Sequence, residues 1–209
     1  MMNVILMLRR ACLALLSSSL GFASSGVLAQ SYPNKPIRMI ISFPPGGGTD
    51  FVARLVAVKL HEKWGQPVVV DNRGGGNGII GSRVAASAKP DGYTLYLGSS
   101  NHLIMGPSTF DKYPYDPIKD FVPVAPVTNQ PFVLAVSSSI PAHTVKELVA
   151  LAKSKPGQLN FASTGSGTVG HLAGHFLQSL AGIDMVHIPY KGSADITTAL
   201  LNGEVSMAF

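Results

Sequence analysis

Cysteine and charge are both scarce in this sequence, and each scarcity excludes a class of protein. There is one cysteine, Cys12, among 209 residues. It lies in an N-terminal segment that we expect to be removed on export, so the mature chain is expected to contain neither a disulfide nor thiol chemistry. Stability must then come from burial of apolar surface, and about 180 residues suffice for one core or two smaller ones.

Charged residues make up only 13% of the chain and form no run of five or more like charges. Of the 16 basic residues, Arg9 and Arg10 lie in the segment 1–29, which has no acidic residue; 14 basic and 11 acidic side chains remain, a formal charge of +3. This even scatter does not indicate a nucleic-acid-binding face. The modest positive balance is compatible with an anionic ligand.

An apolar run long enough to cross a membrane, about 20 residues, is also missing. The N-terminus instead has Arg9 and Arg10, a short apolar stretch at 11–16, a serine-rich part and the small-residue end Val27-Leu28-Ala29. These are the three parts of a secretory signal. We predict a signal peptide over 1–29, cleavage after Ala29 and a soluble exported protein. The choice between general secretory and twin-arginine export stays open.

Short apolar runs rich in β-branched residues recur through the rest of the chain, as in strands buried on both faces of a parallel sheet. Between them, apolar residues recur three or four positions apart, as on one face of a helix, and 144–147 has the form of a capping box. This alternation predicts an α/β fold. The predicted strands are 37–43, 68–70, 94–97, 132–136, 159–162, 185–188 and 205–209; the predicted helical stripes are Val52/Leu55/Val56/Leu60/Trp64, Ile80/Val84/Ala88, Val145/Leu148/Val149/Ala152, Leu172/Phe176/Leu180 and Ile196/Ala199/Leu200.

The middle of the chain differs, because 107–131 contains six prolines and little helical periodicity. Its prolines exclude the extended stretch 121–127 from a central position in a sheet. We therefore predict a hinge or crossover near 128–131. It would separate a first α/β domain, residues 30–128, from a second, residues 129–209.

Four polar, glycine-rich segments each follow a predicted strand: 43–50, 98–102, 163–170 and 189–193. Ligands bind beyond the carboxyl ends of the strands in open parallel sheets. The first and third segments also begin a helix, so their backbone N–H groups and the helix end can hold an anion without an arginine. We interpret Thr49 and Asp50 as the cap of the first of these helices. One such segment alone is equally well explained as a tight turn, but the pair favours an anion-binding cleft between the domains.

Three other interpretations are weaker. Residues 165–170 match the dinucleotide-binding pattern Gly-x-Gly-x-x-Gly, but Asp184 precedes the next strand and therefore lies at the wrong end of the sheet. His171 and His175 have the spacing of zinc ligands, without the glutamate of the metalloprotease motif. Ser166, His171 and Asp184 are the residue types of a hydrolase triad, but Thr164 replaces the first glycine of a nucleophile elbow.

Several stretches in fixed order resemble the Bug family, the periplasmic receptors of tripartite tricarboxylate transporters. The resemblance runs from Tyr32 to Phe209. It rests on 31–38, on Phe-Pro-Pro-Gly-Gly-Gly-Thr-Asp at 43–50, on 67–73 and 90–95, on 115–121 and 156–163, and on His-Ile-Pro-Tyr-Lys-Gly at 187–192.

This resemblance implies a type II periplasmic-binding-protein fold: two α/β domains with a hinge and a ligand cleft between them. It implies a periplasmic, monomeric receptor that captures a small carboxylate for membrane transporter subunits, without catalysis, cofactor, metal or nucleic acid. Backbone amides, hydroxyls and bridging waters typically hold the carboxylate in that family. Carried over by motif, the ligand-binding residues are Phe43, Pro45, Gly46, Gly47, Gly48, Thr49, Ser99, Ser100, Asn101, Thr164, Gly165, Ser166, Gly167, Thr168, Tyr190 and Lys191.

Members of that family continue well past the position of Phe209, so we expect this chain to be C-terminally truncated relative to them. The missing part would complete both domains, and our hypothesis is that the chain alone is unstable or binds poorly. An exported hydrolase or a receptor-derived sensor partner using the same cleft is the alternative function. The sequence does not identify the carboxylate.

Overall fold

The structure, a computed structural model, describes residues 31–110 and 112–209. The predicted signal peptide, 1–29, lies outside the described residues. Lys35–Phe209 forms a compact unit by itself, and the fold given below is that of this unit. It contains two separate sheets, which we call sheet A and sheet B, in line with the predicted α/β class.

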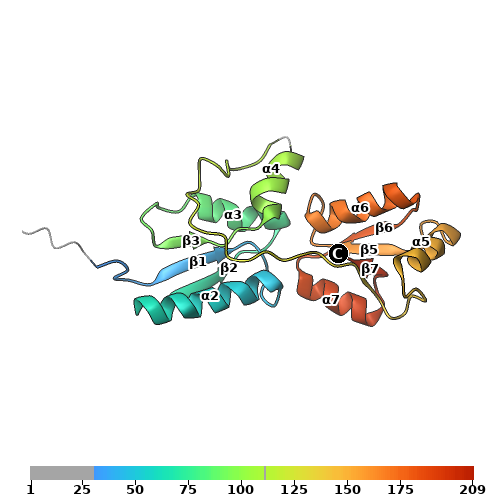
Figure 1. The fold of residues 1–209 in the computed structure, drawn as a ribbon. Coiled ribbons are helices and arrows are strands. Elements are labelled where there is room, and N and C mark those ends of the chain that lie inside the picture. Colours follow the sequence, from blue (N-terminus) through green and yellow to red (C-terminus); the bar gives the residue numbers. More distant parts are fainter. Residues whose placement is uncertain (1–30, 111) are drawn as a thin grey trace, which may run out of the picture. The chain divides into compact units, whose positions relative to one another are not determined.

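Sheet A has the strand order β2-β1-β3, and all its strands are parallel. The central strand β1 (Ile37–Ile41) lies between β2 (Val68–Asn72) and β3 (Thr94–Tyr96). The helices α2 (Gly48–Trp64) and α3 (Ile79–Ala86) cover opposite faces of this sheet (Figure 1). Burial on both faces explains why four of the five residues of β1 are apolar, including three fully buried isoleucines; the exception is Arg38.

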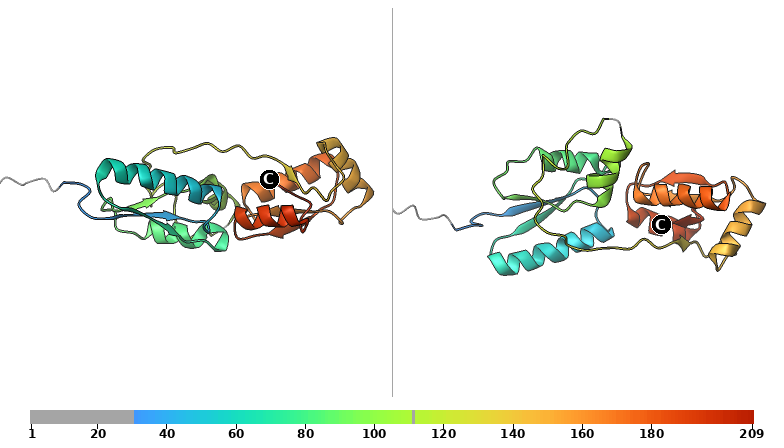
Figure 2. Two further views of the ribbon diagram at one scale, coloured as in Figure 1. Left: turned by 90° about the horizontal axis from the view of Figure 1, so that it is seen from below. Right: turned by 45° about the horizontal axis from the view of Figure 1, so that its top comes forward.

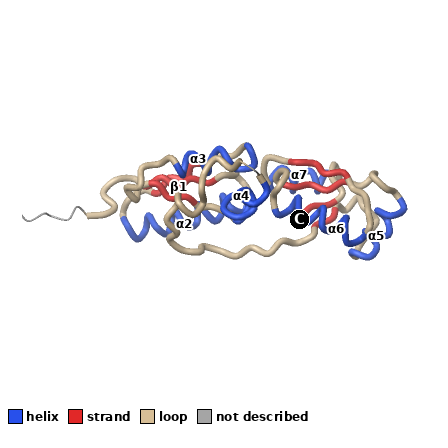
Figure 3. Tube along the Cα trace, turned by 90° about the horizontal axis from the view of Figure 1, so that it is seen from above, coloured by secondary structure: helices blue, strands red, loops and turns tan. Residues whose placement is uncertain are grey.

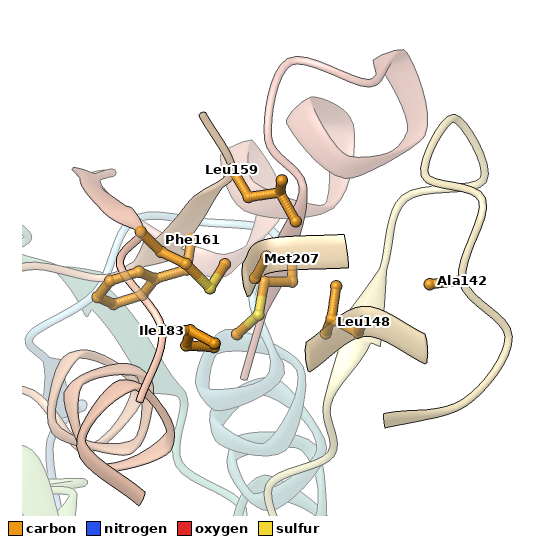
Figure 4. Packing of buried hydrophobic residues seen from close by; sticks show 8 residues of the cluster. Ala142, Leu148, Leu159, Phe161, Ile183 and Met207 are labelled. Carbon is orange, nitrogen blue, oxygen red and sulfur yellow. The ribbon is translucent and has the colours of Figure 1, made fainter. Parts of the chain in front are cut away.

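Sheet B has the order β4-β7-β5-β6 and is parallel except for β4, which pairs antiparallel with β7. Its strands are β4 (Ala135–Val136), β5 (Asn160–Ser163), β6 (Val186–Pro189) and β7 (Met207–Ala208). The helices α6 (Val169–Ala181) and α7 (Ser193–Asn202) lie on opposite faces, and α5 (Val145–Ser154) adds a third helix. In the core of this sheet Leu148, Phe161 and Met207 belong to one cluster of buried apolar side chains (Figure 4).

The five predicted helices are present, but the predicted buried face of α2 is only partly correct and that of α6 is wrong. On α2 the most buried residues are Asp50, Ala53 and Ala57; Val56 and Leu60 are partly buried against the core, and Leu55 is exposed. On α6 the buried residues are Gly170 and Gly174, while Phe176 and Leu180 are 65% and 72% exposed. Helical spacing identified the helices correctly, but on α6 small residues, rather than the large apolar ones, face the sheet because they allow close packing.

Two helix starts show how local contacts position the chain. Thr144 accepts a hydrogen bond from the N–H of Glu147 at 3.2 Å, which confirms the predicted cap of α5. The predicted cap of α2 is wrong: its N-cap is Gly47, which has no capping side chain. Asp50 lies in the first turn and its carboxylate instead accepts from the N–H of Gly46, one residue before the cap.

The proline-rich middle is largely irregular, as predicted, although one short helical stretch begins before it. A π-helical turn, η2 (Asn101–Met105), continues into α4 (Gly106–Thr109), with Pro107 in its first turn, where a missing N–H does no harm. The chain then runs as loop to β4 (Figures 2 and 3). The predicted strand 132–136 shortens to two residues. Among residues 31–110 and 112–209, no helix has the length and apolarity needed to span a membrane.

Candidate ligand-binding site

A cavity of about 100 Å³ lies where loops from the carboxyl ends of both sheets come together. It is lined by residues that follow β1, β2, β3, β5 and β6, as expected for a ligand site in parallel α/β sheets. The lining residues are Ser42, Phe43, Gly75, Gly76, Asn77, Gly78, His102, Thr164, Thr168, Tyr190 and Lys191.

The predicted site residues divide into three groups. Phe43, Thr164, Thr168, Tyr190 and Lys191 line the cavity. Asn101, Ser166 and Gly167 line a smaller neighbouring cavity, together with Asn77 and Thr168. The remaining predicted residues do not line either of these two cavities; they are Pro45, Gly46, Gly47, Gly48, Thr49, Ser99, Ser100 and Gly165.

Sequence reasoning missed one loop of the site entirely. Residues 73–78 connect β2 to α3 and include a short 3-10 turn, η1 (Gly76–Gly78). This loop is glycine-rich, follows a strand and precedes a helix, which is the same pattern that identified the other loops. Asn77 in it has a positive φ of 53°, a conformation that asparagine tolerates better than most residues. The pattern was therefore present in the sequence but was not applied to this segment.

The loop after β1, residues 43–48, is held by the buried carboxylate of Asp50. This carboxylate accepts hydrogen bonds from Gly46 N at 3.0 Å, Asn72 Nδ2 at 2.9 Å and Arg54 Nε at 3.0 Å. The bond from Arg54 is the main cause that lowers the pKa of Asp50 to about 2. A permanently ionised carboxylate therefore links this loop to both α2 and β2.

A network of hydroxyl groups lies behind Ser42, the residue that follows β1 and lines the cavity. Ser42 Oγ lies 2.9 Å from Tyr96 Oη and 3.2 Å from Ser82 Oγ, and Ser82 Oγ lies 2.7 Å from Tyr96 Oη. Burial raises the pKa of Tyr96 to about 12, so this phenol stays protonated. The network fixes Ser42, which lines the cavity, from behind.

His102 contributes a buried but uncharged ring to the wall. It is 1% exposed, and burial lowers its pKa to about 4. Its ring lies 4.9 Å from that of Phe43, between centroids, and its Nδ1 is 3.2 Å from Ser99 Oγ. A backbone hydrogen bond to Asn77 joins it to the missed loop. His102 is therefore neutral at physiological pH and links three of the site loops.

The loop after β5, residues 163–168, is held by neutral groups. Ser163 Oγ accepts from Gly165 N at 3.1 Å and lies 2.7 Å from His187 Nε2. His171 Nδ1 accepts from Gly167 N at 3.2 Å. Burial lowers the pKa of His171 and of His187, and neighbouring histidines lower both further. These rings act as uncharged hydrogen-bonding partners beneath the loop.

The chemistry of the lining fits an anion. Among the residues that line the cavity, Lys191 carries a full positive charge and there is no carboxylate. Thr164 and Tyr190 supply hydroxyls that can donate to an anionic oxygen, whereas the hydroxyl of Thr168 already donates to Gly165 O. The start of α6 lies directly behind Thr168, so the helix end adds a partial positive charge. The site can therefore bind an anion without an arginine clamp.

Sequence comparison shows which protein family the chain belongs to. Residues 52–209 match the Tripartite tricarboxylate transporter family receptor. The chain belongs to this family. One relative within it is the protein BugT from Bordetella pertussis, 41% identical over 181 residues, which cover 86% of this chain and 56% of BugT. The chain spans little more than half the length of the curated relatives it matches.

Several solved structures share this fold over 85% of the chain. Rpa4515 of R. palustris, solved with adipate, has a TM-score of 0.82 and 32% identity, covering 85% of this chain and 60% of that one. MatC of Rhodopseudomonas palustris, solved with malate, has a TM-score of 0.74 and 31% identity, covering 85% and 60%. The periplasmic binding protein BugD has a TM-score of 0.74 and 31% identity, covering 85% of this chain and 59% of BugD. These likenesses confirm the predicted fold class.

The dinucleotide, zinc and hydrolase interpretations of the sequence find little support in the geometry. His171 and His175 meet edge to face with their ring centroids 4.5 Å apart, and among residues 31–110 and 112–209 no three potential ligands are arranged to hold a metal. Asp184 precedes β6, and its carboxylate lies beside Gly157. The histidine nearest a serine hydroxyl is His187, but that serine, Ser163, is 1% exposed and bonded within its own loop.

Proposed function

We propose that this chain is part of an extracytoplasmic solute-binding receptor that captures a small carboxylate for a tripartite tricarboxylate-type transporter. The observation that carries the proposal is the composition of the cavity: hydroxyls and backbone groups, the ammonium of Lys191 and no carboxylate. The adipate and malate with which two similar proteins were solved support the ligand class. Periplasmic location, a monomeric state and the transporter partnership belong to the same proposal.

The proposed mode of binding divides the work between the two sheets. Thr164, after β5, would donate to one carboxylate, with the N-terminus of α6 nearby. Lys191, after β6, would add an ion pair at the more exposed side, and Phe43 would provide an apolar wall. The glycine-rich residues 46–49 and Ser99–Ser100 would shape the edge of the cleft rather than its floor. The proposed role includes no chemical step, so no residue is assigned a catalytic function.

Calorimetric titration of the purified chain with adipate and with malate tests this proposal. We expect saturable binding of at least one of them, because all the residues that line the cavity lie within the compact unit Lys35–Phe209. This expectation is the opposite of the sequence-based hypothesis that the chain alone is unstable or binds poorly, and the titration decides between the two. Lys191→Gln should weaken it about three- to tenfold, most strongly at low salt, because the ion pair is partly exposed. Lys146→Gln, on the exposed face of α5, is the matched control and should have no effect.

The same samples, followed by proton NMR over a day, separate a receptor from an enzyme. A receptor leaves both acids chemically unchanged. Turnover of either acid, or binding that Lys191→Gln and Lys146→Gln weaken equally, would contradict the proposed function.

A further inference from the structure

Two asparagine side chains from the sheet A loops bond to the backbone of the loop after β5. Asn77 Nδ2 donates to Ser166 O at 2.7 Å, and Asn101 Oδ1 accepts from Val169 N at 2.9 Å. The partners lie 89 and 68 residues away in sequence, so both bonds join loops of the two sheets. Because one partner is a carbonyl and the other an N–H, each amide can only be oriented one way.

The hydrogen bond that Asn101 accepts takes the place of the side-chain cap that α6 lacks. Thr168 is the N-cap of α6, but its side chain makes no capping hydrogen bond. Its Oγ1 donates instead to Gly165 O at 2.7 Å. The first N–H groups of a helix have no intrahelical acceptor, and the N–H of Val169 finds its acceptor in Asn101. The cap of α6 thus comes from the other sheet's loops.

The glycines of the loop after β5 make this approach sterically feasible. A Cβ at position 165 would lie 2.0 Å from Asn77 Oδ1, and Gly165 has a positive φ of 124°. A Cβ at position 167 would lie 3.2 Å from Thr109 Oγ1. This close approach explains why positions 165 and 167 are glycines, without any need for a dinucleotide phosphate.

We propose that Asn77 and Asn101 are positioning residues that hold the loop 165–168 against the sheet A loops and thereby set the places of Thr164 and Thr168 in the cavity. Both bonds end on backbone atoms, so they depend on the position of the loop and not on its side chains. The role of the pair in affinity rests on the proposed function. Its role in holding the two sets of loops together does not.

The opposite hydrogen-bonding roles of the two asparagines allow a matched test with one substitution, Asn→Asp. Asn101→Asp keeps the acceptor for Val169 N, and its charge also suits a helix N-terminus. Asn77→Asp removes the donor and places a carboxylate against the carbonyl of Ser166. Asn101→Ala removes the acceptor. Asn129→Asp, in an exposed part of the loop before β4, controls for the added charge.

The primary measurement is made without ligand, on the full chain carrying Cys12→Ser and spin labels at Lys63→Cys on α2 and Ser179→Cys on α6. Pulsed dipolar spectroscopy reports the distance between the two helices. We expect the parent, Asn101→Asp and Asn129→Asp to share one distance distribution. In Asn77→Asp and Asn101→Ala the ratio of that population to the populations at other distances should fall about two- to tenfold, the effect of one hydrogen bond.

Adipate and malate titrations of the same variants give the second readout, where dissociation constants should rise in the same order and by similar factors. If neither acid binds any variant, the proposed function fails while the distance measurement still decides this inference. An Asn101→Asp protein that behaves like Asn101→Ala would overturn it. So would an Asn77→Asp protein that matches Asn129→Asp in distance.

Discussion

The loop after β1 and the loop after β5 occupy equivalent places, yet different chemistry holds each of them. Both follow a central buried strand, both are rich in glycine, and both lead into a helix. The first is held by the ionised carboxylate of Asp50, bonded to Gly46, Asn72 and Arg54. The second is held by the hydroxyl of Ser163 and by the neutral rings of His171 and His187.

Because different groups hold the two loops, the stability of each loop should depend on pH in a different range. Because the pKa of Asp50 is lowered to about 2, its contribution to stability is present above about pH 4 and is lost as the pH falls through about 2. His171 and His187 have lowered pKa values, so their contribution is complete above about pH 6.5 and declines as the pH falls below it. Mild acid should therefore loosen the second loop first.

The largest expected effect is that of Asp50→Ala. Removing a buried carboxylate leaves Gly46 N and Asn72 without their acceptor, and we expect the free energy of unfolding to fall by about 3 kcal/mol. Asp195→Ala is the matched control, because Asp195 occupies the same third position of α7 but is exposed. Urea unfolding of both variants checks this. Equal losses would mean that the carboxylate does not hold the loop.

The helices behind the two loops pack differently as well, and Gly174→Ala tests this. α2 packs Ala53 and Ala57 on its sheet, whereas α6 packs Gly170 and Gly174. A Cβ at 174 would lie 2.2 Å from Phe161 Cε2, so we expect a loss of about 2 kcal/mol despite alanine's better helix propensity.

Gly170→Ala is the control for this prediction, since a Cβ there would meet its nearest atom at 3.5 Å. It should be neutral or slightly stabilising in the same urea experiment. A neutral Gly174→Ala would show that the close packing of α6 is not needed.

Ser163→Ala should lower the free energy of unfolding by less than Asp50→Ala or Gly174→Ala. The N–H of Gly165 loses its buried acceptor, and His187 loses its nearest hydroxyl, at a cost of about 1.5 kcal/mol. Ser138→Ala, at an exposed position before α5, serves as control. Thermal unfolding measured by circular dichroism checks the difference. If Ser163→Ala unfolds at the same temperature as the parent, Ser163 does not hold the loop after β5.

The smallest effect concerns the imidazole of His171. His171→Asn places an amide oxygen near the position of Nδ1, so the bond from Gly167 should survive, whereas His171→Leu should lose it at about 0.5–1 kcal/mol. His171→Asn should also reduce the loss of stability on acidification from pH 6.5 to 5, because one titrating group is gone. Urea midpoints over that range give the comparison. An unchanged pH dependence would remove His171 from the acid response.

Much of the fold could be predicted from the sequence because it depends on local patterns. The isoleucines of β1 and the capping box at Thr144 were sufficient to place a strand and a helix. The buried face of α6 could not be predicted in this way. Glycine has no side chain to mark a helix face, so Leu172, Phe176 and Leu180 suggested the wrong one.

The candidate site could be predicted only in part, for a related reason. Loops that end a strand could be recognised one at a time, and Thr164, Thr168, Tyr190 and Lys191 line the cavity; that they bind a ligand stays a prediction. Which residues bond across loops depends on tertiary contacts that leave no local pattern. The bond of Asn101 to Val169 and the burial of His102 are of this kind.

The most direct test of the central claim is a thermal melt of the purified chain, alone and with a panel of carboxylic acids that includes adipate and malate. Ligand binding to the folded state raises its stability, so a receptor for one of these acids should melt at a higher temperature with it, in a concentration-dependent way. The account predicts a cooperative transition that at least one acid shifts upward. A cooperative transition that no carboxylic acid shifts would contradict it.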